Sequence, residues 1–329
     1  MKKIIAILLV ISVLFSFAGC SGEKNKETVA ATEAVQQEDL SLLTATAKYL
    51  TEQVPNPAYG SVGGEWLALG LARAELEGME DYLFYYGEQV SEYVAEKAGV
   101  LHAKKYTEYS RLILAWTALG RDPSNVAGFN MLVPLADFEQ TVFQGINGAI
   151  FALLALDSGD YDIPENVAQS TQASRDLYVD HILRAQLEDG GWALNGSAAE
   201  IDMTAMALQA LAKYRDWAEV EKAVEKGLEL LSRQQKANGG FSDSNGETCE
   251  AIAQSIVALT ELGISLEDDR FVKNGNTLLN ALQQFRTEDG GFSHLMGMAT
   301  DILATEQAFY ALVAIDRMEQ GKTSLYSMK

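Results

Sequence analysis

Three copies of a glycine–glycine–aromatic segment constrain the fold of this chain more than any other feature. They are Gly190-Gly191-Trp192, Gly239-Gly240-Phe241 and Gly290-Gly291-Phe292, and their first glycines are 49 and 51 residues apart. A repeat of this length holds two helices of ordinary length with their loops. Glycine readily adopts the left-handed backbone of a turn that follows a helix. The repeat therefore predicts pairs of helices, with the aromatic side chain packed under the end of the preceding helix.

Two kinds of helix alternate along these repeats. Between Trp217 and Gln235, apolar residues recur at steps of three and four, and charged residues fill the other positions, which is typical of a helix with one wet face. By contrast, Asp202–Lys213, Ala251–Leu262 and Ala304–Ile315 are apolar nearly all round, as in helices buried on most sides. The alternation predicts two concentric rings, with polar-faced helices outside and apolar helices inside.

The first half of the chain carries weaker copies of the pattern. Gly63-Gly64-Glu65-Trp66 precedes the apolar stretch Leu67–Ala74, and Leu112–Trp116 and Ala149–Leu156 have the composition of further inner helices. Strand signals are almost absent. With about six helix pairs in all, we expect an all-α chain that forms an (α/α)6 toroid over residues 40–329.

The N-terminal segment predicts where the protein resides. An uncharged stretch, residues 4–19, follows two lysines and is short for a membrane span. It ends in Phe17-Ala18-Gly19-Cys20, which resembles a bacterial lipoprotein signal. The resemblance implies removal of residues 1–19, lipid on Cys20, and attachment to the extracytoplasmic face of the cell membrane. An ordinary secretion signal and an N-terminal anchor helix are the alternatives.

A polar segment follows the predicted signal, and the charge of the whole chain limits the kinds of partner that it can bind. Residues 20–39 lack apolar periodicity, which is typical of a flexible tether. The chain has 46 Asp and Glu against 25 Lys and Arg, a net charge of −21, so it repels phosphate backbones and a nucleic-acid partner is not expected. Once Cys20 carries lipid, Cys249 is the remaining thiol. No intramolecular disulfide is then possible.

The repeats resemble those of a known superfamily. Gln186 and Gln235 stand four residues before the first glycine of their copies, and Arg286 takes that place in the third. This Gln-x-x-x-Gly-Gly-aromatic pattern, followed by apolar helices, resembles the terpene cyclase and protein prenyltransferase superfamily. The resemblance implies six outer and six inner helices around a central cavity. It says little about function, because that fold hosts cyclases, prenyl transferases, cobalamin carriers and binding domains.

One stretch is similar to the acidic motif of class II cyclases, Asp-x-Asp-Asp-Thr-Ala, whose middle aspartate protonates an alkene. The corresponding residues here are Glu200-Ile201-Asp202-Met203-Thr204-Ala205. The resemblance makes Asp202 the candidate general acid, although Met203 replaces one acidic neighbour. Such chemistry needs a carboxylic acid that its surroundings hold protonated until use. The alternative is that Asp202 only caps an apolar helix.

A cyclase cavity would also need aromatic faces around a cation. The candidate cavity or ligand-binding residues are Trp66, Trp116, Phe151, Glu200, Phe309 and Tyr310. Core packing is the alternative for the aromatic ones.

Zinc chemistry has less support. The prenyl transferases of the superfamily bind zinc through Asp-x-Cys and a later histidine, and Glu247-Thr248-Cys249 falls where the first pair would lie. Ala304 stands where the histidine would, and His294 lies in the preceding loop. Since three suitable ligands are not assembled, we expect no metal and no cofactor.

These observations favour a membrane-tethered extracytoplasmic protein that binds a ligand or a partner. The ligand would be a small apolar or flat molecule, a peptide or a glycan in the central mouth, or another protein on the surface. A cyclase-like enzyme that uses Asp202 as general acid on an isoprenoid is the first alternative. A structural barrel with a plugged centre is the second.

Overall fold

The computed structural model describes residues 41–166, 170–241 and 246–329. Residues 42–329 form one compact unit. The predicted signal segment, Cys20 and the tether lie outside the described residues.

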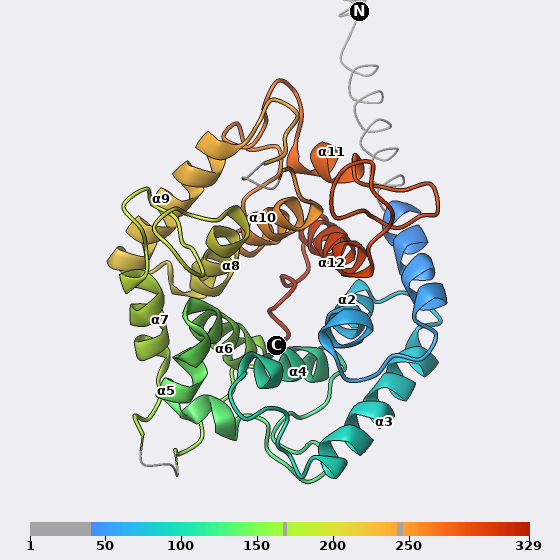
Figure 1. Cartoon of the computed structure of the whole chain (residues 1–329), viewed down its shortest axis with the longest axis vertical. Helices are drawn as coiled ribbons and strands as arrows, with labels where there is room; N and C mark the ends of the chain where they lie inside the picture. Colours follow the sequence, from blue (N-terminus) through green and yellow to red (C-terminus); the bar gives the residue numbers. More distant parts are fainter. Residues whose placement is uncertain (1–40, 167–169, 242–245) are drawn as a thin grey trace, which may run out of the picture. The chain divides into compact units, whose positions relative to one another are not determined.

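Within the compact unit, six helices form an inner ring and six form an outer ring (Figure 1). The inner helices are α2 (Trp66–Ala74), α4 (Thr107–Ala118), α6 (Ile146–Ser158), α8 (Ile201–Leu211), α10 (Cys249–Glu261) and α12 (Ile302–Glu319). The outer helices are residues 42–53, α3 (Glu80–Glu96), α5 (Phe138–Thr141), α7 (Arg175–Arg184), α9 (Ala218–Gln234) and α11 (Leu278–Gln283). Each inner helix contacts the next, and α12 contacts α2 and closes the ring.

The prediction of an all-α (α/α)6 toroid is confirmed. The described residues contain isolated β-bridges and no named strand. The inner helices are buried nearly all round, as α6 illustrates with ten of its thirteen residues buried. The outer ring is less regular than predicted, because α5 is a single turn and α11 spans six residues.

In two of the three copies, the repeated glutamine bonds the Gly-Gly turn to a backbone carbonyl further along the chain. The Gln186 side chain donates to the carbonyls of Gly190 and Ala223, both at 2.8 Å, and Gln235 bonds in the same way to Gly239 and Phe271. In the third copy the Thr287 hydroxyl donates to the Gly291 carbonyl at 2.9 Å. A hydroxyl one residue later thus bonds the turn where Arg286 replaces the glutamine.

The aromatic residue and the glycine of each turn have separate roles. Trp192 is fully buried and its indole N–H donates to the Ile182 carbonyl at the end of α7, at 2.7 Å, as the sequence predicts. Gly239 has a φ of +88°, and a Cβ there would lie 2.3 Å from the Thr277 carbonyl oxygen. Both the backbone conformation and the close approach therefore require glycine.

In the first half, the predicted weak copy lies directly before the first inner helix, as expected. Gly63 and Gly64 lie in η1 (Ser61–Glu65), between the outer helix of residues 42–53 and α2, and their backbone is not helical, with Gly63 at a φ of +71°. Glu65 is fully buried, accepts from the Gly60 N–H, and pairs with Arg111 at 2.7 Å. Glu306 of α12 accepts from the Gly63 N–H at 2.6 Å. Buried carboxylates hold the chain here, where turn chemistry holds it in the later repeats.

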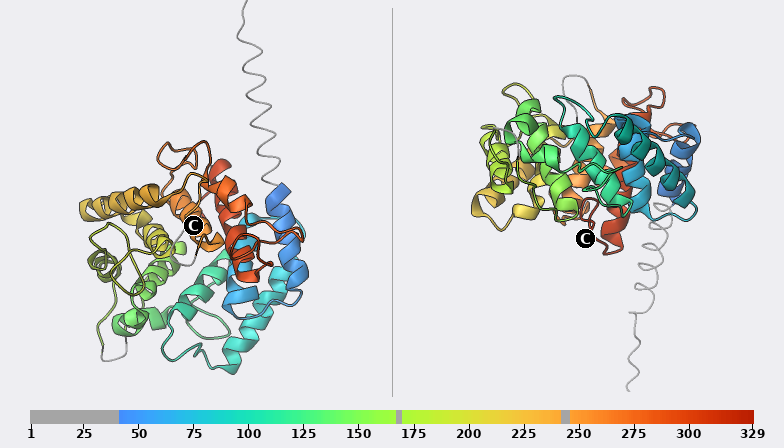
Figure 2. Two further views of the ribbon diagram at one scale, coloured as in Figure 1. Left: turned by 45° about the horizontal axis from the view of Figure 1, so that its top comes forward. Right: turned by 90° about the horizontal axis from the view of Figure 1, so that it is seen from below.

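The C-terminal segment closes one end of the ring. Figure 2 shows the C-terminus at one face of the ring, and the Met328 N–H donates to the carbonyl of Ser158, the last residue of α6, at 2.9 Å. Leu325 and Tyr326 are buried, and the Arg73 guanidinium donates to four carbonyl oxygens of this segment. Glu261 of α10 accepts from the Tyr326 N–H at 3.1 Å. The opposite face, where the inner helices begin, is therefore the accessible mouth of the ring.

Among the residues described, no single helix is long and apolar enough to cross a membrane. One bent pair, Phe138–Gln144 with Ile146–Ser158, meets the length and composition criteria together.

Candidate functional site

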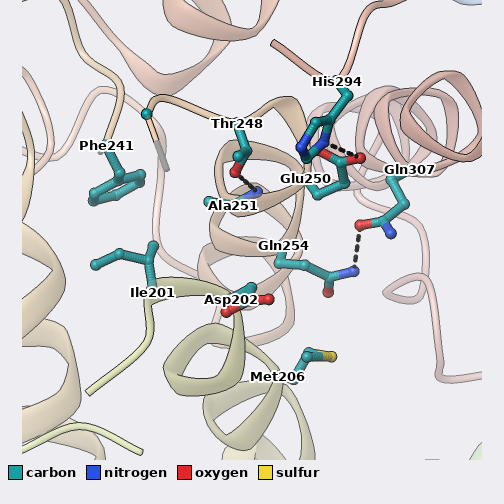
Figure 3. A pocket seen from close by; sticks show the side chains of 11 residues that line it. Ile201, Asp202, Met206, Phe241, Thr248, Glu250, Ala251, Gln254, His294 and Gln307 are labelled. Carbon is teal, nitrogen blue, oxygen red and sulfur yellow. Dashed lines mark hydrogen bonds and ion pairs between the residues drawn. The ribbon is translucent and has the colours of Figure 1, made fainter. Parts of the chain in front are cut away.

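A pocket of about 340 Å³ lies at the mouth, where α8, α10 and α12 begin (Figure 3). Its polar lining comes from all three helices and from the loop before α12: Asp202, Thr248, Glu250, Gln254, His294 and Gln307. Ile201, Met206 and Phe241 supply apolar walls. The pocket is thus lined by carboxylates and amides beside a hydrophobic surface.

Asp202 lies on this pocket, in the first turn of α8. Its Oδ1 accepts from the Met203 N–H at 2.8 Å. The N-cap residue of α8 is Glu200, so the prediction that Asp202 is the cap is wrong by two positions. A negative charge in the first helical turn is nevertheless favourable. Its role as a general acid stays a prediction.

Glu200 does not belong to the pocket lining. Its carboxylate accepts from the Leu194 N–H at 3.0 Å, and it makes no side-chain cap for α8. The reason is that Glu200 ends the loop that precedes the helix, where its backbone also pairs with Trp192.

Glu250 is the residue of α10 that corresponds to Asp202. Each follows the N-cap of its helix by two positions, Thr248 being the N-cap of α10. Both Glu250 carboxylate oxygens lie 2.9 Å from His294 Nδ1. The His294 side chain is 52% exposed and the Glu250 side chain 18%. The sequence analysis missed Glu250, although its place in the repeat was a usable signal.

A chain of amides, buried at Gln209 and Gln254 and half-buried at Gln307, joins the neighbouring inner helices α8, α10 and α12. Gln209 Nε2 donates to the Gln254 carbonyl and to Gln254 Oε1, both at 2.9 Å. Gln254 Nε2 in turn donates to Gln307 Oε1 at 2.9 Å and contacts the Tyr310 hydroxyl. Each amide is oriented by its neighbour, so this amide ladder (Gln209, Gln254, Gln307) is preorganised. The amide ladder was not predicted from the sequence, although glutamines within otherwise apolar helices were a usable signal.

Three of the predicted cavity aromatics meet at the centre of the ring. The Trp66 ring lies 5.7 Å from Phe151 and 6.0 Å from Tyr310, between ring centroids. These residues come from α2, α6 and α12, so the cluster bridges the ring beside the amide ladder. Large side chains therefore occupy part of the centre.

Trp116 and Phe309 pack elsewhere, and their prediction as cavity residues is corrected. Trp116 is buried with the Arg121 guanidinium 4.9 Å from its ring centroid. Phe309 is fully buried against α2, where a Cβ on Gly70 would lie 2.8 Å from its ring. Both residues lie on inner helices, but on faces turned to neighbouring elements.

The zinc ligands of the prenyl transferases are not assembled. Cys249 is fully buried, its Sγ lies 3.8 Å from the Ala304 carbonyl oxygen, and burial raises its thiol pKa well above the ordinary value. His294 contacts Glu250, and Glu247 accepts from the Asn238 amide. Among the described residues, no group of three or more His, Cys, Asp and Glu side chains is placed to hold a metal ion.

The model of the prenyltransferase alpha-alpha toroid domain matches residues 136–241 and 219–326, more than half of the chain. The chain therefore belongs to the prenyltransferase alpha-alpha toroid family. This match begins in the first half and covers all three clear repeats.

Solved structures of two kinds share the fold. The type II terpene cyclase MstE from Scytonema is 14% identical, with a TM-score of 0.56 over 85% of this chain and 99% of that chain. A variant of it in complex with its substrate, geranylgeranyl dihydroxybenzoate, gives a TM-score of 0.58 at 87% and 99% coverage. An unsaturated glucuronyl hydrolase from Bacillus sp. GL1 is 13% identical, with a TM-score of 0.50 over 89% and 99%. No curated protein matches the chain. At these identities the likeness concerns the fold alone.

Proposed function

We propose that this protein binds a small hydroxylated molecule, of the size and chemistry of a saccharide, in the pocket at the mouth of the ring. The observation that carries the proposal is the convergence of hydrogen-bonding side chains from three inner helices on one pocket. Carboxylates accept from ligand hydroxyls, and amides both donate and accept. Phe241, Met206 and Ile201 offer an apolar surface to the ligand's C–H groups.

Size supports a small ligand. The pocket, at about 340 Å³, is near the lower end of the usual range of roughly 300–1,000 Å³ for small-molecule sites. The aromatic cluster of Trp66, Phe151 and Tyr310 narrows the space toward the centre. A saccharide fits these limits better than a long isoprenoid chain does. Of the ligands predicted from the sequence, which were a small apolar molecule, a peptide or a glycan, the proposal retains the glycan.

Membrane tethering belongs to the proposal as well. Its support is the sequence pattern that ends in Cys20, which resembles a lipoprotein signal. Lipid on Cys20 would place the pocket on the extracytoplasmic face of the cell membrane, where saccharides are encountered.

A cyclase-like enzyme is the second candidate, with Asp202 as general acid on an isoprenoid. Its support is the position of Asp202 on the pocket, in a toroid whose solved relatives include type II terpene cyclases. The two candidates make different demands on Asp202. As a ligand contact, the residue affects retention of an unchanged molecule. As an acid, it is required for conversion.

Native mass spectrometry of the full chain in detergent tests the proposal. The probes are N-acetylglucosamine, cellobiose and geranylgeraniol. We expect a retained sugar of unchanged mass, and retention weaker by about 5- to 150-fold in Gln307→Ala, because a lost hydrogen bond costs about 1–3 kcal/mol. The matched control is Asp301→Asn, since Asp301 begins the same helix and does not line the pocket.

Two results would contradict the saccharide proposal. One is the absence of any retained sugar. The other is conversion of geranylgeraniol to an isomer by the wild-type chain and not by Asp202→Asn, which would establish the cyclase instead.

A further inference from the structure

A second pocket, of about 320 Å³, lies at the opposite, closed end of the ring. Its walls include Leu154 of α6, Gln209 of α8 and Glu261 of α10. The C-terminal segment contributes Ser324, Tyr326 and Ser327. The pocket is separated from the mouth by the amide ladder, because Gln209 lines this pocket and Gln254 lines the other.

The feature that points to a ligand is the carbonyl oxygen of the Gln209 side chain. Gln209 is 3% exposed, and its Oε1 has no hydrogen-bond partner. The amide cannot be turned round, because its Nε2 already donates to two acceptors of Gln254. A buried acceptor without a donor costs about 1–3 kcal/mol. A donor that enters the second pocket would remove this cost.

Gln235 provides the comparison that makes Gln209 specific. Its Oε1 is also buried without a partner, and its Nε2 also donates twice. Gln235, however, lies under a Gly-Gly turn and does not line the second pocket. Gln209 therefore combines two features, an acceptor without a donor and a place in the lining of the second pocket.

The neighbouring groups define the chemistry of that donor. Glu261 accepts from the Ser324 hydroxyl at 2.7 Å and from the Tyr326 N–H at 3.1 Å. An ionised carboxylate offers about four acceptor positions, so both oxygens retain capacity. Lys213 and Lys329 also line the pocket and each pairs with Asp160. An amide oxygen and a carboxylate together suit a protonated amine.

We propose that the closed end of the ring is a second binding site, which takes a small primary amine between Gln209 and Glu261 under the C-terminal segment. The ammonium group donates to Gln209 Oε1 and to the Glu261 carboxylate. It thereby becomes the first donor of a hydrogen-bonded chain that runs through Gln254 to Gln307 at the mouth. Such chains polarise one another along their length.

Saturation-transfer difference NMR on the full chain in detergent tests this site, with n-propylammonium as the probe and propionate as the matched anion. We expect saturable binding of n-propylammonium and none of propionate. Gln209→Leu removes the acceptor and should weaken binding at least tenfold. Ser327→Trp changes an exposed residue of the pocket rim without touching the amide ladder, and should block the site.

The outcomes separate the two pockets. Asp202→Asn, at the mouth, should leave n-propylammonium binding unchanged. Binding that falls in Asp202→Asn and persists in Ser327→Trp would place the amine at the mouth and overturn the proposal. Absence of saturable binding would also overturn it, since water would then be the partner of Gln209. Neither result bears on saccharide retention at the mouth.

Discussion

In the C-terminal half of the ring, each Gly-Gly-aromatic turn is bonded by its own side chains, and α10 and α12 begin with side-chain caps from Thr248 and Asp301. In the N-terminal half, α2, α4 and α6 begin without such caps. There, Glu65 pairs with Arg111, 46 residues away, and Gly63 bonds Glu306, 243 residues away. The same architecture thus rests on local turn chemistry in one half and on buried, long-range polar contacts in the other.

This difference explains why the repeat is recognisable in the sequence of the C-terminal half and not in that of the N-terminal half. A turn whose partners lie within a few residues leaves a repeated pattern in the sequence. A buried carboxylate paired across the ring leaves only a single charged residue in an apolar context. Substitutions that remove one kind of interaction at a time test this difference between the two halves.

The largest effect is expected for Arg111→Met in the N-terminal half. The substitution leaves Glu65, which is fully buried, without its charged partner. Breaking a buried pair in this way costs about 3–5 kcal/mol in the free energy of unfolding. Urea denaturation measures the loss. The matched control is Lys48→Ala, which breaks the exposed Lys48–Glu52 pair and should change stability by less than about 0.5 kcal/mol. Equal effects would show that burial of the pair is unimportant.

A pH-dependent effect is expected next, from Glu306. Its pKa is raised from 4.5 to about 8, chiefly by burial; the Gly63 N–H that donates to it lowers the pKa, and the nearby Glu65 and Asp301 raise it by smaller amounts. The folded state therefore binds the proton more tightly than the unfolded state. Its contribution to stability is fully present below pH 4.5 and is lost as the pH rises toward 8.

The measurement is the free energy of unfolding of the wild-type chain and of Glu306→Gln at several pH values between 4.5 and 9. The wild-type stability should fall relative to that of the variant as pH rises. Parallel curves would mean that Glu306 does not titrate in this range.

In the C-terminal half, Gly239→Ala should destabilise by about 2–3 kcal/mol. Left-handed backbone costs a non-glycine residue about 1–2 kcal/mol, and the new Cβ would meet the Thr277 carbonyl oxygen at 2.3 Å. Gly263→Ala is the control, because Gly263 has a φ of +67° and open space around its Cβ position. It should cost only the backbone term, about 1 kcal/mol. Equal losses in thermal or urea denaturation would argue against the close contact.

The smallest effect is expected at a helix cap. The Asp301 carboxylate accepts from the Ala304 N–H at 2.8 Å. Asp301→Ala should cost about 1 kcal/mol, and Asp301→Asn only a few tenths, because asparagine caps about as well as aspartate. Urea denaturation of both variants checks this order. An equally large loss in Asp301→Asn would show that the charge, and not the cap, stabilises α12.

The sequence predicted the toroid because its signals are local. Helical periodicity located α9 and the inner helices, and the Gly-Gly-aromatic repeat located the turns, including the buried position of Trp192. Gly63-Gly64 likewise lies between an outer and an inner helix, but Glu65 and Glu306 bond this segment in place of a glutamine or threonine.

The candidate site was predictable only in part. Asp202 was predicted from a motif. Three aromatic residues, Trp66, Phe151 and Tyr310, were predicted from their positions on inner helices. Trp116 and Phe309 could not be separated from them, because helical spacing does not say which neighbour a side chain meets across the ring. Gln254 and Gln307 were missed, since their partnership joins helices more than fifty residues apart.

The most direct test of the central claim is native mass spectrometry of the purified full chain after exposure to an extract of membrane lipids and small metabolites. The account predicts a retained polar species whose mass is unchanged and which is lost on Gln307→Ala. Release of an isomerised or hydrated isoprenoid, abolished by Asp202→Asn, would contradict it and identify the protein as a cyclase.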